Sequence, residues 1–520
     1  MKNLIEKSLV SLQKKGQIPD FKIPSVIIER APQDFRGDYS SNIALTVKGQ
    51  SKKKPFELAD LIKKEIKGAG FLKKIETAKP GFINFFVSPE FLQNSLKEVL
   101  KEKQKFGSLV LGKGKSINVE FISANPTGPL TLGNGRGGFC GDVLANVLEK
   151  SGYKVTREYY VNDMGEQIRK LGHSVLGDSK AVYKGEYIKE LRERIKGEDP
   201  EKVGEKASQE IMKSVIKPSI KKMGIEFDVW FSEKSLHKGE VEKVLSFLKE
   251  KGHVYEKEGA LWFNTTKFGD DKDRVLIRKN KEKTYFASDI AYLKNKFERG
   301  FDKLIFFLGA DHAGYIKRME AASQALEDDK EKLDFIVMQL VRLFQKGEKV
   351  KMSKRAGTYV TIDELIEEVG SDAARFFFLM RGPGSHLNFD LDLAKERSQK
   401  NPVYYVQYAH TRISSILRKS EMSFKGAGLG LLKEPSELAL AKEIVRLPEI
   451  MEDIAKDYQV QRLTQYARDL ADAFHKFYED CQVLTKDQDL AKARLSLILA
   501  AKIALANALG VMGISLPEKM

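Results

Sequence analysis

The sequence predicts an α/β protein in which a parallel-sheet domain lies between a small α/β domain and an all-helical C-terminal region. A strand-like run at 117–122, a glycine-rich segment, a helix-like run at 139–150 and a strand-like run at 153–161 follow one another. This β-α-β order predicts parallel strands. From residue 391 onward, glycine and proline become sparse and apolar residues recur at helical spacing. Further strand-like apolar runs occur at 275–277, 304–308 and 335–338.

We expect three domains along the 520 residues. Residues 1–112 alternate helix-like and strand-like patterns, with a strand over 82–87 after a Lys-Pro-Gly turn. Residues 113–390 are expected to form a parallel-sheet domain of Rossmann type. A charged, mostly helical insertion over about 166–270 interrupts that domain. Residues 391–520 are expected to form a helical bundle.

The charge of the chain is concentrated near its N-terminus. The net charge is +16, and residues 1–116 contain 23 Lys and Arg against 12 Asp and Glu. A basic domain on a protein of this size favours a polyanionic partner such as a nucleic acid. A solvated, lysine-rich surface is the alternative.

Several classes of protein are disfavoured by composition. No uncharged apolar stretch reaches the ~20 residues that span a bilayer, and the nearest, 495–516, is interrupted by Lys502 and Asn507. We therefore expect a packed helix there and no membrane. Cys140 and Cys481 form no CxxC pattern, which predicts core residues in a reducing cytoplasm. The seven histidines show no metal-ligand spacing, and no structural metal is expected.

The glycine-rich segment Ala124–Gly138 has two interpretations. Gly133, Gly135 and Gly138 fit the G-x-G-x-x-G pattern of dinucleotide-binding proteins, and Glu158 follows at the acidic position. In that pattern, however, the first glycine ends the strand directly, whereas ten residues with two prolines intervene here. The second interpretation is an ATP site, because small residues allow close approach of a base and a helix N-terminus favours phosphate.

A lysine motif favours the ATP interpretation. Lys351, Met352, Ser353 and Lys354 are followed by Ala-Gly, and then by a capping-box pattern at 361–364 that starts a helix. Two lysines on a loop can close over the charge that develops on an α-phosphate and a leaving pyrophosphate.

The chain resembles the class I aminoacyl-tRNA synthetases through this lysine motif and the glycine-rich segment, and the arginyl-tRNA synthetase family in particular. Segments along nearly the whole chain carry the resemblance: Gly37–Asn42, Pro80–Phe85, Val119–Leu130, Tyr159–Gly165, Leu308–His312 and Val406–Arg412.

The resemblance has one departure. The family signature His-x-Gly-His reads Thr131-Leu132-Gly133-Asn134 here. Thr and Asn side chains donate hydrogen bonds but carry no positive charge. An active enzyme with a variant signature is the main interpretation. An inactive tRNA-binding relative and a different class I synthetase are the alternatives.

The resemblance implies ATP-dependent ligation of L-arginine to tRNA(Arg) through an arginyl-adenylate, with Mg²⁺ accompanying ATP. It implies an arginine pocket at Glu120, Asn125, Tyr285 and Asp289. An internal salt bridge is the alternative for Glu120, and a surface or cap position for Asp289. The implied catalytic residues are Thr131, Asn134, Lys351 and Lys354, and the implied ATP-binding residues are Gly133, Gly135, Asp311, His312, Met352 and Ser353. A core position is the alternative for His312.

Two groups of residues are expected to bind tRNA. Phe82 and Asn84 of the N-terminal domain would contact an unpaired base of the D-loop, by stacking and hydrogen bonding. Tyr408 and Arg412, in a run that also holds Tyr404 and Tyr405, would contact the anticodon. Core packing is the alternative for aromatic residues at this helical spacing. We expect a cytoplasmic monomer, since no dimer seam is apparent.

Overall fold

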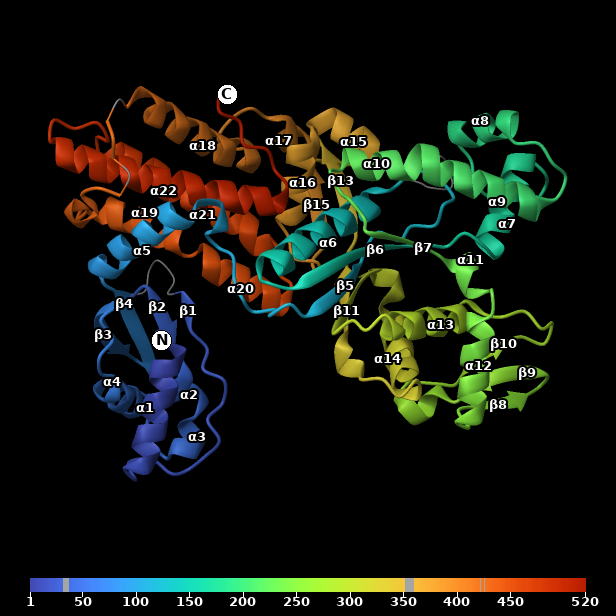
Figure 1. Ribbon diagram of the computed structural model, residues 1–520, viewed down its shortest axis with the longest axis horizontal. Helices are drawn as coiled ribbons and strands as arrows, with labels where there is room; N and C mark the ends of the chain where they lie inside the picture. Colours follow the sequence, from blue (N-terminus) through green and yellow to red (C-terminus); the bar gives the residue numbers. More distant parts are fainter. Residues whose placement is uncertain (31–36, 351–359, 421, 425) are drawn as a thin grey trace. The chain divides into compact units, whose positions relative to one another are not determined.

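The computed structural model describes residues 1–30, 37–350, 360–420, 422–424 and 426–520 (Figure 1). The chain divides into two compact units. One contains residues 1–104, 416–445 and 473–504, and the other contains residues 105–415, 446–472 and 505–520. Three long helices contribute residues to both units: α18 (Pro402–Lys419), α21 (Gln461–Asp480) and α22 (Gln488–Met512).

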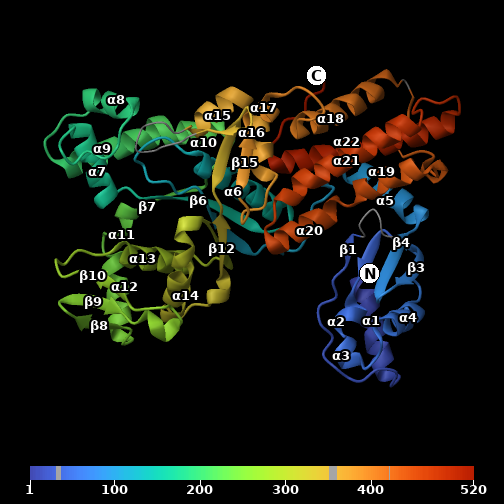
Figure 2. The same ribbon diagram turned by 180° about the vertical axis from the view of Figure 1, so that it is seen from behind.

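A five-stranded sheet forms the centre of the second unit. Its order is β12-β11-β5-β6-β7 and every pair is parallel, which confirms the predicted α/β class (Figures 1 and 2). The strand order reverses between β5 and β11, and such a switch point is where ligands bind in open parallel sheets. The strands are β5 (Ser116–Glu120), β6 (Lys154–Val161), β7 (Val229–Ser232), β11 (Lys303–Gly309) and β12 (Leu333–Met338).

Helix α6 (Leu132–Lys150) packs on β5, β6 and β11. It begins at Leu132 rather than at the predicted residue 139, so four of the five glycines of the glycine-rich segment lie inside the helix. Close packing explains why glycines occur in this helix. A Cβ on Gly135 would lie 2.5 Å from Ile362, and a Cβ on Gly141 would lie 2.4 Å from Phe121. The glycines therefore let the helix approach its neighbours, and the preceding cap starts it.

The predicted insertion over about 166–270 begins with helices, but strand β7 of the parallel sheet and two strands of a second sheet also lie within these residues. Its helices are α7 (Glu166–Leu176), α8 (Glu186–Arg194), α9 (Pro200–Ile211) and α10 (Lys217–Lys222). The 275–277 run lies in strand β10 (Arg274–Ile277), which pairs antiparallel with β9 (Ala260–Phe263) and, beyond it, β8 (Val254–Lys257), outside the parallel sheet.

The remaining elements of this unit surround the sheet. They are α11 (Glu233–Leu236), α12 (Glu240–Glu250), α13 (Tyr285–Glu298), α14 (Ile316–Ala325), β13 (Val341–Gln345), β14 (Glu348–Lys349), α15 (Ile362–Val369), α16 (Ser371–Leu379), β15 (Leu387–Asp390), α17 (Leu391–Lys395) and α20 (Leu447–Asp457). Strand β13 pairs with β14 and β15 in a small third sheet.

The N-terminal residues form an antiparallel sheet, of order β1-β2-β4-β3, with helices over one side of a small core. Its strands are β1 (Glu29–Arg30), β2 (Tyr39–Ser41), β3 (Leu72–Ala78) and β4 (Phe82–Val87), and its helices are α1 (Lys2–Lys14), α2 (Ile43–Thr46), α3 (Lys48–Ser51) and α4 (Pro55–Glu65). The predicted strand over 82–87 is confirmed. Within the same unit, Lys442 of α19 (Pro435–Val445) pairs with Asp38 at 2.5 Å, and α5 (Pro89–Glu102) packs on α19.

Helix α22 is long and apolar enough, by length and composition, to cross a membrane. However, 67% of its most apolar window is buried inside the protein, as in the core helix of a globular domain. The structure therefore agrees with the packed helix predicted around residues 495–516. The C-terminal region is helical as predicted, while the three domain boundaries stay predictions.

Candidate active site

The chain turns sharply where β5 ends, at the switch point of the sheet. Glu120 is the last residue of β5, and Ile122 (φ 65°) and Ser123 (φ 39°) follow in the left-handed region. Such angles are costly for non-glycine residues, above all for β-branched ones, and persist where other contacts hold them. The Ser123 hydroxyl supplies one such contact, because it accepts a hydrogen bond from the Tyr160 backbone N–H at 3.0 Å. The turn directs residues 124–130 across the edge of the sheet toward α6.

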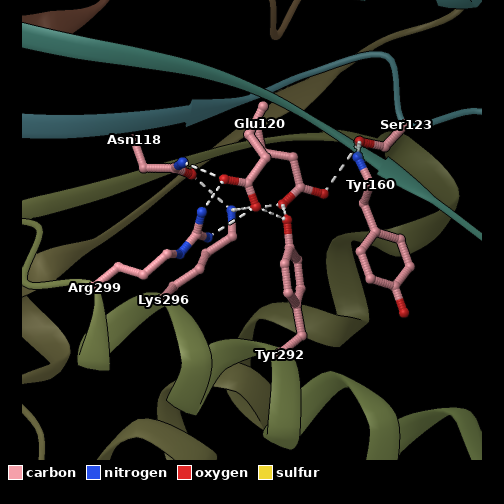
Figure 3. A network of polar contacts seen from close by, with 8 residues as sticks. Asn118, Glu120, Ser123, Tyr160, Tyr292, Lys296 and Arg299 are labelled. Atoms are coloured by element: carbon pink, nitrogen blue, oxygen red, sulfur yellow. Dashed lines mark hydrogen bonds and ion pairs between the residues drawn. The ribbon is translucent and has the colours of Figure 1, made fainter. Parts of the chain in front are cut away.

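Glu120 belongs to a buried network between the sheet and α13 (Figure 3). Its Oε2 atom accepts hydrogen bonds from Tyr292 Oη at 2.9 Å and Lys296 Nζ at 2.7 Å. Its Oε1 atom accepts one from the Ser123 hydroxyl at 3.2 Å. The internal salt bridge considered for Glu120 is therefore present, with Lys296 as the partner.

Glu158 of β6 is the second carboxylate of this network. Arg299 donates to both of its oxygens, at 2.7 and 2.9 Å, and the Asn118 amide donates at 2.8 Å. Burial alone would raise the pKa of Glu158, but the Lys296 charge and the Arg299 hydrogen bonds bring it below its ordinary value. Glu158 therefore has a structural role, which also removes it as the acidic residue of a dinucleotide site.

A second group of carboxylates lies near this network and has no Lys or Arg partner among the described residues. Asp289 of α13 accepts a hydrogen bond from the Tyr315 hydroxyl. Burial, with the nearby Glu120 charge adding to it, raises the pKa of Asp289 to about 7. Burial and the charge of Asp289 likewise raise the pKa of Glu233 to about 7. Within the described ranges, neither carboxylate forms an ion pair with Lys or Arg, although His237 lies 3.9 Å from Glu233.

The structure brings the four predicted arginine-binding residues to one region. Glu120 and Asp289 are close enough for the charge of one to raise the pKa of the other. With its amide group turned over, Asn162 donates to Glu233 Oε2 at 2.7 Å, and its amide oxygen lies 3.2 Å from the Asn125 side chain. Tyr285 lies one helical turn before Asp289 on α13 and is 43% exposed. The surface and cap positions considered for Asp289 are excluded, because it lies within the helix and makes its hydrogen bond inside the protein.

Sequence reasoning missed Glu233, Tyr315 and the α13 residues behind Glu120. One signal was readable in the sequence for α13. Its polar and aromatic residues recur at intervals of four and three, which places them on one face of a helix: Tyr285, Asp289, Tyr292, Lys296 and Arg299. No comparable signal pointed to Glu233 or Tyr315, because they reach the site through the fold.

The N-terminus of α6 is formed by the residues at the signature positions. Thr131 Oγ1 accepts a hydrogen bond from the Asn134 N–H at 3.3 Å, and Asn134 Oδ1 accepts one from the Thr131 N–H at 3.0 Å. The two side chains therefore form a capping box. Gly133 is exposed, and a Cβ there would make only an ordinary contact with Thr131 Oγ1 at 3.7 Å, whereas Gly135 is buried against Ile362. Of these two glycines, Gly133 is the one at which a ligand can approach the backbone.

The lysine motif, Lys351, Met352, Ser353 and Lys354, lies outside the described residues. Its C-terminal border is described. Thr361 forms an isolated bridge with Thr131, and Ile362 N–H donates to the Leu130 carbonyl at 3.0 Å. The predicted capping box at 361–364 is confirmed. The segment that follows the motif is therefore attached to the cap of α6.

Asp311 and His312 lie in a short 3-10 helix after β11, the strand next to β5. Both side chains are exposed, 81% and 64%, and their nearest polar atoms are 3.6 Å apart. The core position considered for His312 is therefore excluded. Across the described part of the chain, no group of three or more His, Cys, Asp or Glu side chains is arranged to hold a metal ion.

The four predicted tRNA-binding residues are buried or half-buried. Phe82 is half-buried at the start of β4, and Asn84 is 4% exposed and accepts a hydrogen bond from Ser40 Oγ at 2.8 Å. Tyr408 and Arg412 are half-buried on α18. Their contacts with tRNA stay predictions.

The sheet order, the crossing segment from β5 to α6 and the carboxylates at the switch point define the catalytic domain of a class I aminoacyl-tRNA synthetase. Comparison with known proteins agrees. Residues 95–176 and 178–377 match the family "tRNA synthetases class I (R), catalytic domain". Residues 1–87 match "Arginyl tRNA synthetase N terminal domain", and residues 406–520 match "DALR anticodon binding domain".

The chain belongs to the arginyl-tRNA synthetase family. It is 45% identical to the arginine--tRNA ligase of Caldanaerobacter subterraneus, over 100% of this chain and 98% of that protein. A crystal structure of a putative arginyl-tRNA synthetase from Campylobacter jejuni is 33% identical, with a TM-score of 0.76 over 84% of this chain and all of that one. Thermus thermophilus arginyl-tRNA synthetase, 22% identical, shares the fold over 100% of both chains, with a TM-score of 0.79.

Proposed function

We propose how the residues of this arginyl-tRNA synthetase divide the work of the reaction. The enzyme ligates L-arginine to tRNA(Arg) through an arginyl-adenylate and releases AMP and pyrophosphate. The observation that supports our assignment best is the pair of Asp289, which is partly buried, and Glu233, which is buried; neither carboxylate has a Lys or Arg partner among the described residues. Buried charges are normally paired, and a guanidinium would supply the partner.

In this proposal the substrate side chain enters beside Glu120 and Asp289. A guanidinium is planar, permanently charged and has five donors, so it needs several acceptors around it. Asp289 supplies the carboxylate that faces it, Glu120 supplies a second, and the Tyr285 hydroxyl and the Asn125 amide hold the rest of the amino acid. A lysine substrate has a point charge with three donors and would leave part of this set unpaired.

ATP is proposed to bind over Gly133 at the N-terminus of α6, where backbone N–H groups and the helix dipole favour phosphate. Asp311, His312, Met352 and Ser353 complete the proposed nucleotide site, and Gly135 contributes through the close packing of α6 on Ile362. The arginine carboxylate attacks the α-phosphate and pyrophosphate leaves. Lys351 and Lys354 neutralise the charge that develops, while Thr131 and Asn134 donate hydrogen bonds. Mg²⁺ is proposed as the ion that accompanies ATP, held chiefly by phosphate oxygens.

The tRNA contacts are also proposals. Phe82 and Asn84 are assigned to the D-loop, with Phe82 the more accessible of the two, and Tyr408 and Arg412 to the anticodon. The concentration of positive charge in residues 1–116 supports electrostatic attraction of the phosphate backbone. We further propose three domains bounded near residues 112 and 390, a monomer, and a cytoplasmic location, which the two free, buried cysteines support.

Arginylation kinetics test the catalytic assignment. We expect Lys351→Ala and Lys354→Ala each to lower kcat about 100-fold, the usual effect of removing a donor that stabilises transition-state charge. KM for arginine should change little, because these lysines act on phosphate. A raised KM for arginine with unchanged kcat would contradict the assignment.

A further inference from the structure

The face of α13 behind the arginine pocket has a function beyond packing. We propose that Tyr292 and Lys296 are positioning residues of the pocket, which fix the direction and the charge balance of the Glu120 carboxylate for guanidinium recognition. This inference rests on the role proposed above for Glu120. It concerns two residues that touch Glu120 from inside the protein and need not touch the substrate.

The hydrogen bonds on Glu120 are unevenly distributed between its two oxygens (Figure 3). Oε2 receives both the Tyr292 hydroxyl at 2.9 Å and the Lys296 ammonium at 2.7 Å, whereas Oε1 receives the Ser123 hydroxyl at 3.2 Å. A carboxylate oxygen has two lone pairs. Oε2 therefore faces both α13 donors, and Oε1 keeps acceptor capacity for another donor. The α13 residues thus determine which oxygen is available.

Lys296 also balances the charge of the buried carboxylates. Its side chain is fully buried and lies 2.7 Å from Glu120 and 3.8 Å from Glu158. With Arg299 on Glu158, the two carboxylates face two cations. The network is therefore neutral as a whole, and Asp289 and Glu233 retain the negative charge that a cationic substrate would match. Without Lys296, Arg299 would still neutralise Glu158, but Glu120, Asp289 and Glu233 would lie near one another without a cation. Like charges in a buried region disfavour one another.

The Tyr292 hydroxyl connects the two carboxylates. It lies 2.9 Å from Glu120 Oε2 and 2.5 Å from Glu158 Oε1, with one proton to donate. Lys296 has three donors and uses two of them, on Glu120 and on Asn118 Oδ1, both at 2.7 Å. Glu158 is already held by Arg299 without either residue. Lys296 therefore acts chiefly on Glu120, whereas the Tyr292 hydroxyl shares its single proton between the two carboxylates.

Steady-state arginylation by the full-length enzyme tests the proposal. Tyr292→Phe removes one hydroxyl and keeps the ring. We expect KM for arginine to rise about tenfold, the usual effect of losing a hydrogen bond to a charged group, with kcat and KM for ATP within about twofold. Lys296→Met should raise KM for arginine further. If that variant does not fold, Tyr292→Phe alone decides the question.

Two further variants separate positioning from general destabilisation. Tyr255→Phe removes an equivalent hydroxyl, 2.9 Å from the Asp273 carboxylate in the small antiparallel sheet, and should leave KM for arginine unchanged. Combining Tyr292→Phe with Glu120→Gln should give a KM no higher than Glu120→Gln alone, because Tyr292 acts through Glu120.

The outcomes distinguish this inference from the pocket assignment. An unchanged KM for arginine in Glu120→Gln would overturn the assignment of Glu120 to the pocket, and the inference with it. A raised KM in Glu120→Gln together with an unchanged KM in Tyr292→Phe would overturn the inference alone. So would equal increases in KM for arginine and ATP, or additive effects in the double variant.

Discussion

Asp289 shows most clearly what the protein environment does to a single residue. It is a carboxylate on a helix, bonded to the Tyr315 hydroxyl, and burial raises its pKa to about 7. A carboxylate in this state takes up a proton below neutral pH. Bound arginine would favour its charged form, since the guanidinium stays protonated. Arginine binding and the ionisation of Asp289 should therefore be coupled.

This coupling predicts the pH dependence of arginine use. As pH falls from 8 to 6, KM for arginine should rise about tenfold, because binding must then release a proton. The stability of the ligand-free enzyme should change in the opposite direction: its free energy of unfolding should be higher at pH 6 than at pH 8. Its raised carboxyl pKa contributes stability at low pH that is lost as pH rises through 7, which urea unfolding at pH 6 and pH 8 would detect.

Replacing the side chain gives a second check. Asp289→Asn should raise KM for arginine about 30-fold or more at pH 8, since losing one partner of a buried charge pair costs about 2–5 kcal/mol. It should also reduce the rise in KM between pH 8 and pH 6. Asp302→Asn is the matched control, because Asp302 binds Ser116 at the amino end of β5. An unchanged KM in Asp289→Asn would remove Asp289 from the pocket.

Thr131 and Asn134 cap α6, and we propose that they also act at the nucleotide site. Asn134→Ala removes the side-chain acceptor of the Thr131 N–H. We expect the free energy of unfolding to fall by about 1 kcal/mol and kcat to fall as well. Ser88→Ala removes the N-cap of α5 and should cost similar stability with normal kcat. If both variants kept a normal kcat, Asn134 would be a capping residue without a catalytic role.

At the scale of elements, α6 depends on small residues for its packing. Gly141→Ala would place a methyl group 2.4 Å from Phe121 Cγ, and overpacking of this kind costs about 1–3 kcal/mol. Gly137→Ala, in the same helix, meets no atom within 4 Å and should be neutral or stabilising by about 0.5–1 kcal/mol. Urea unfolding of both variants measures the difference. Equal effects would contradict the close-packing explanation.

The sequence predicted elements better than their boundaries. Strand β4 and the cap at 361–364 were found because turn residues and capping residues act locally. The start of α6 was placed too late, because glycines weaken helix propensity while tertiary packing of Gly135 and Gly141 overrides it. The strand at 275–277 was recognised, but its sheet was not, because pairing partners are set by contacts distant in sequence.

The sequence predicted part of the candidate site, as it predicted part of the fold. Glu120, Asn125, Tyr285 and Asp289 were named from the family resemblance, and the structure brings them together. Lys296 and Tyr292 share a face of α13 with Asp289 and were readable as a pattern, but not as partners of Glu120. Glu233 and Tyr315 come from separate parts of the chain, and only the fold brings them to the same region.

For the whole molecule, the uneven charge predicts how tRNA is held. The net charge of +16 is concentrated in residues 1–116, so tRNA binding should release counterions from phosphate. We expect the Kd for tRNA(Arg) to weaken steeply between 50 and 200 mM salt, by about 10³-fold if six phosphates are contacted. KM for arginine should change far less, because buried charges are screened less than exposed ones. A tRNA affinity independent of salt would contradict an electrostatic contribution.

The most direct test of the central claim is pyrophosphate exchange with each of the twenty amino acids, with and without tRNA(Arg). The claim is that carboxylates at the switch point of the sheet select a guanidinium for attack on the α-phosphate of ATP. It predicts exchange with arginine and not with lysine or any other amino acid. Exchange with a different amino acid, or none with arginine while tRNA still binds, would contradict it.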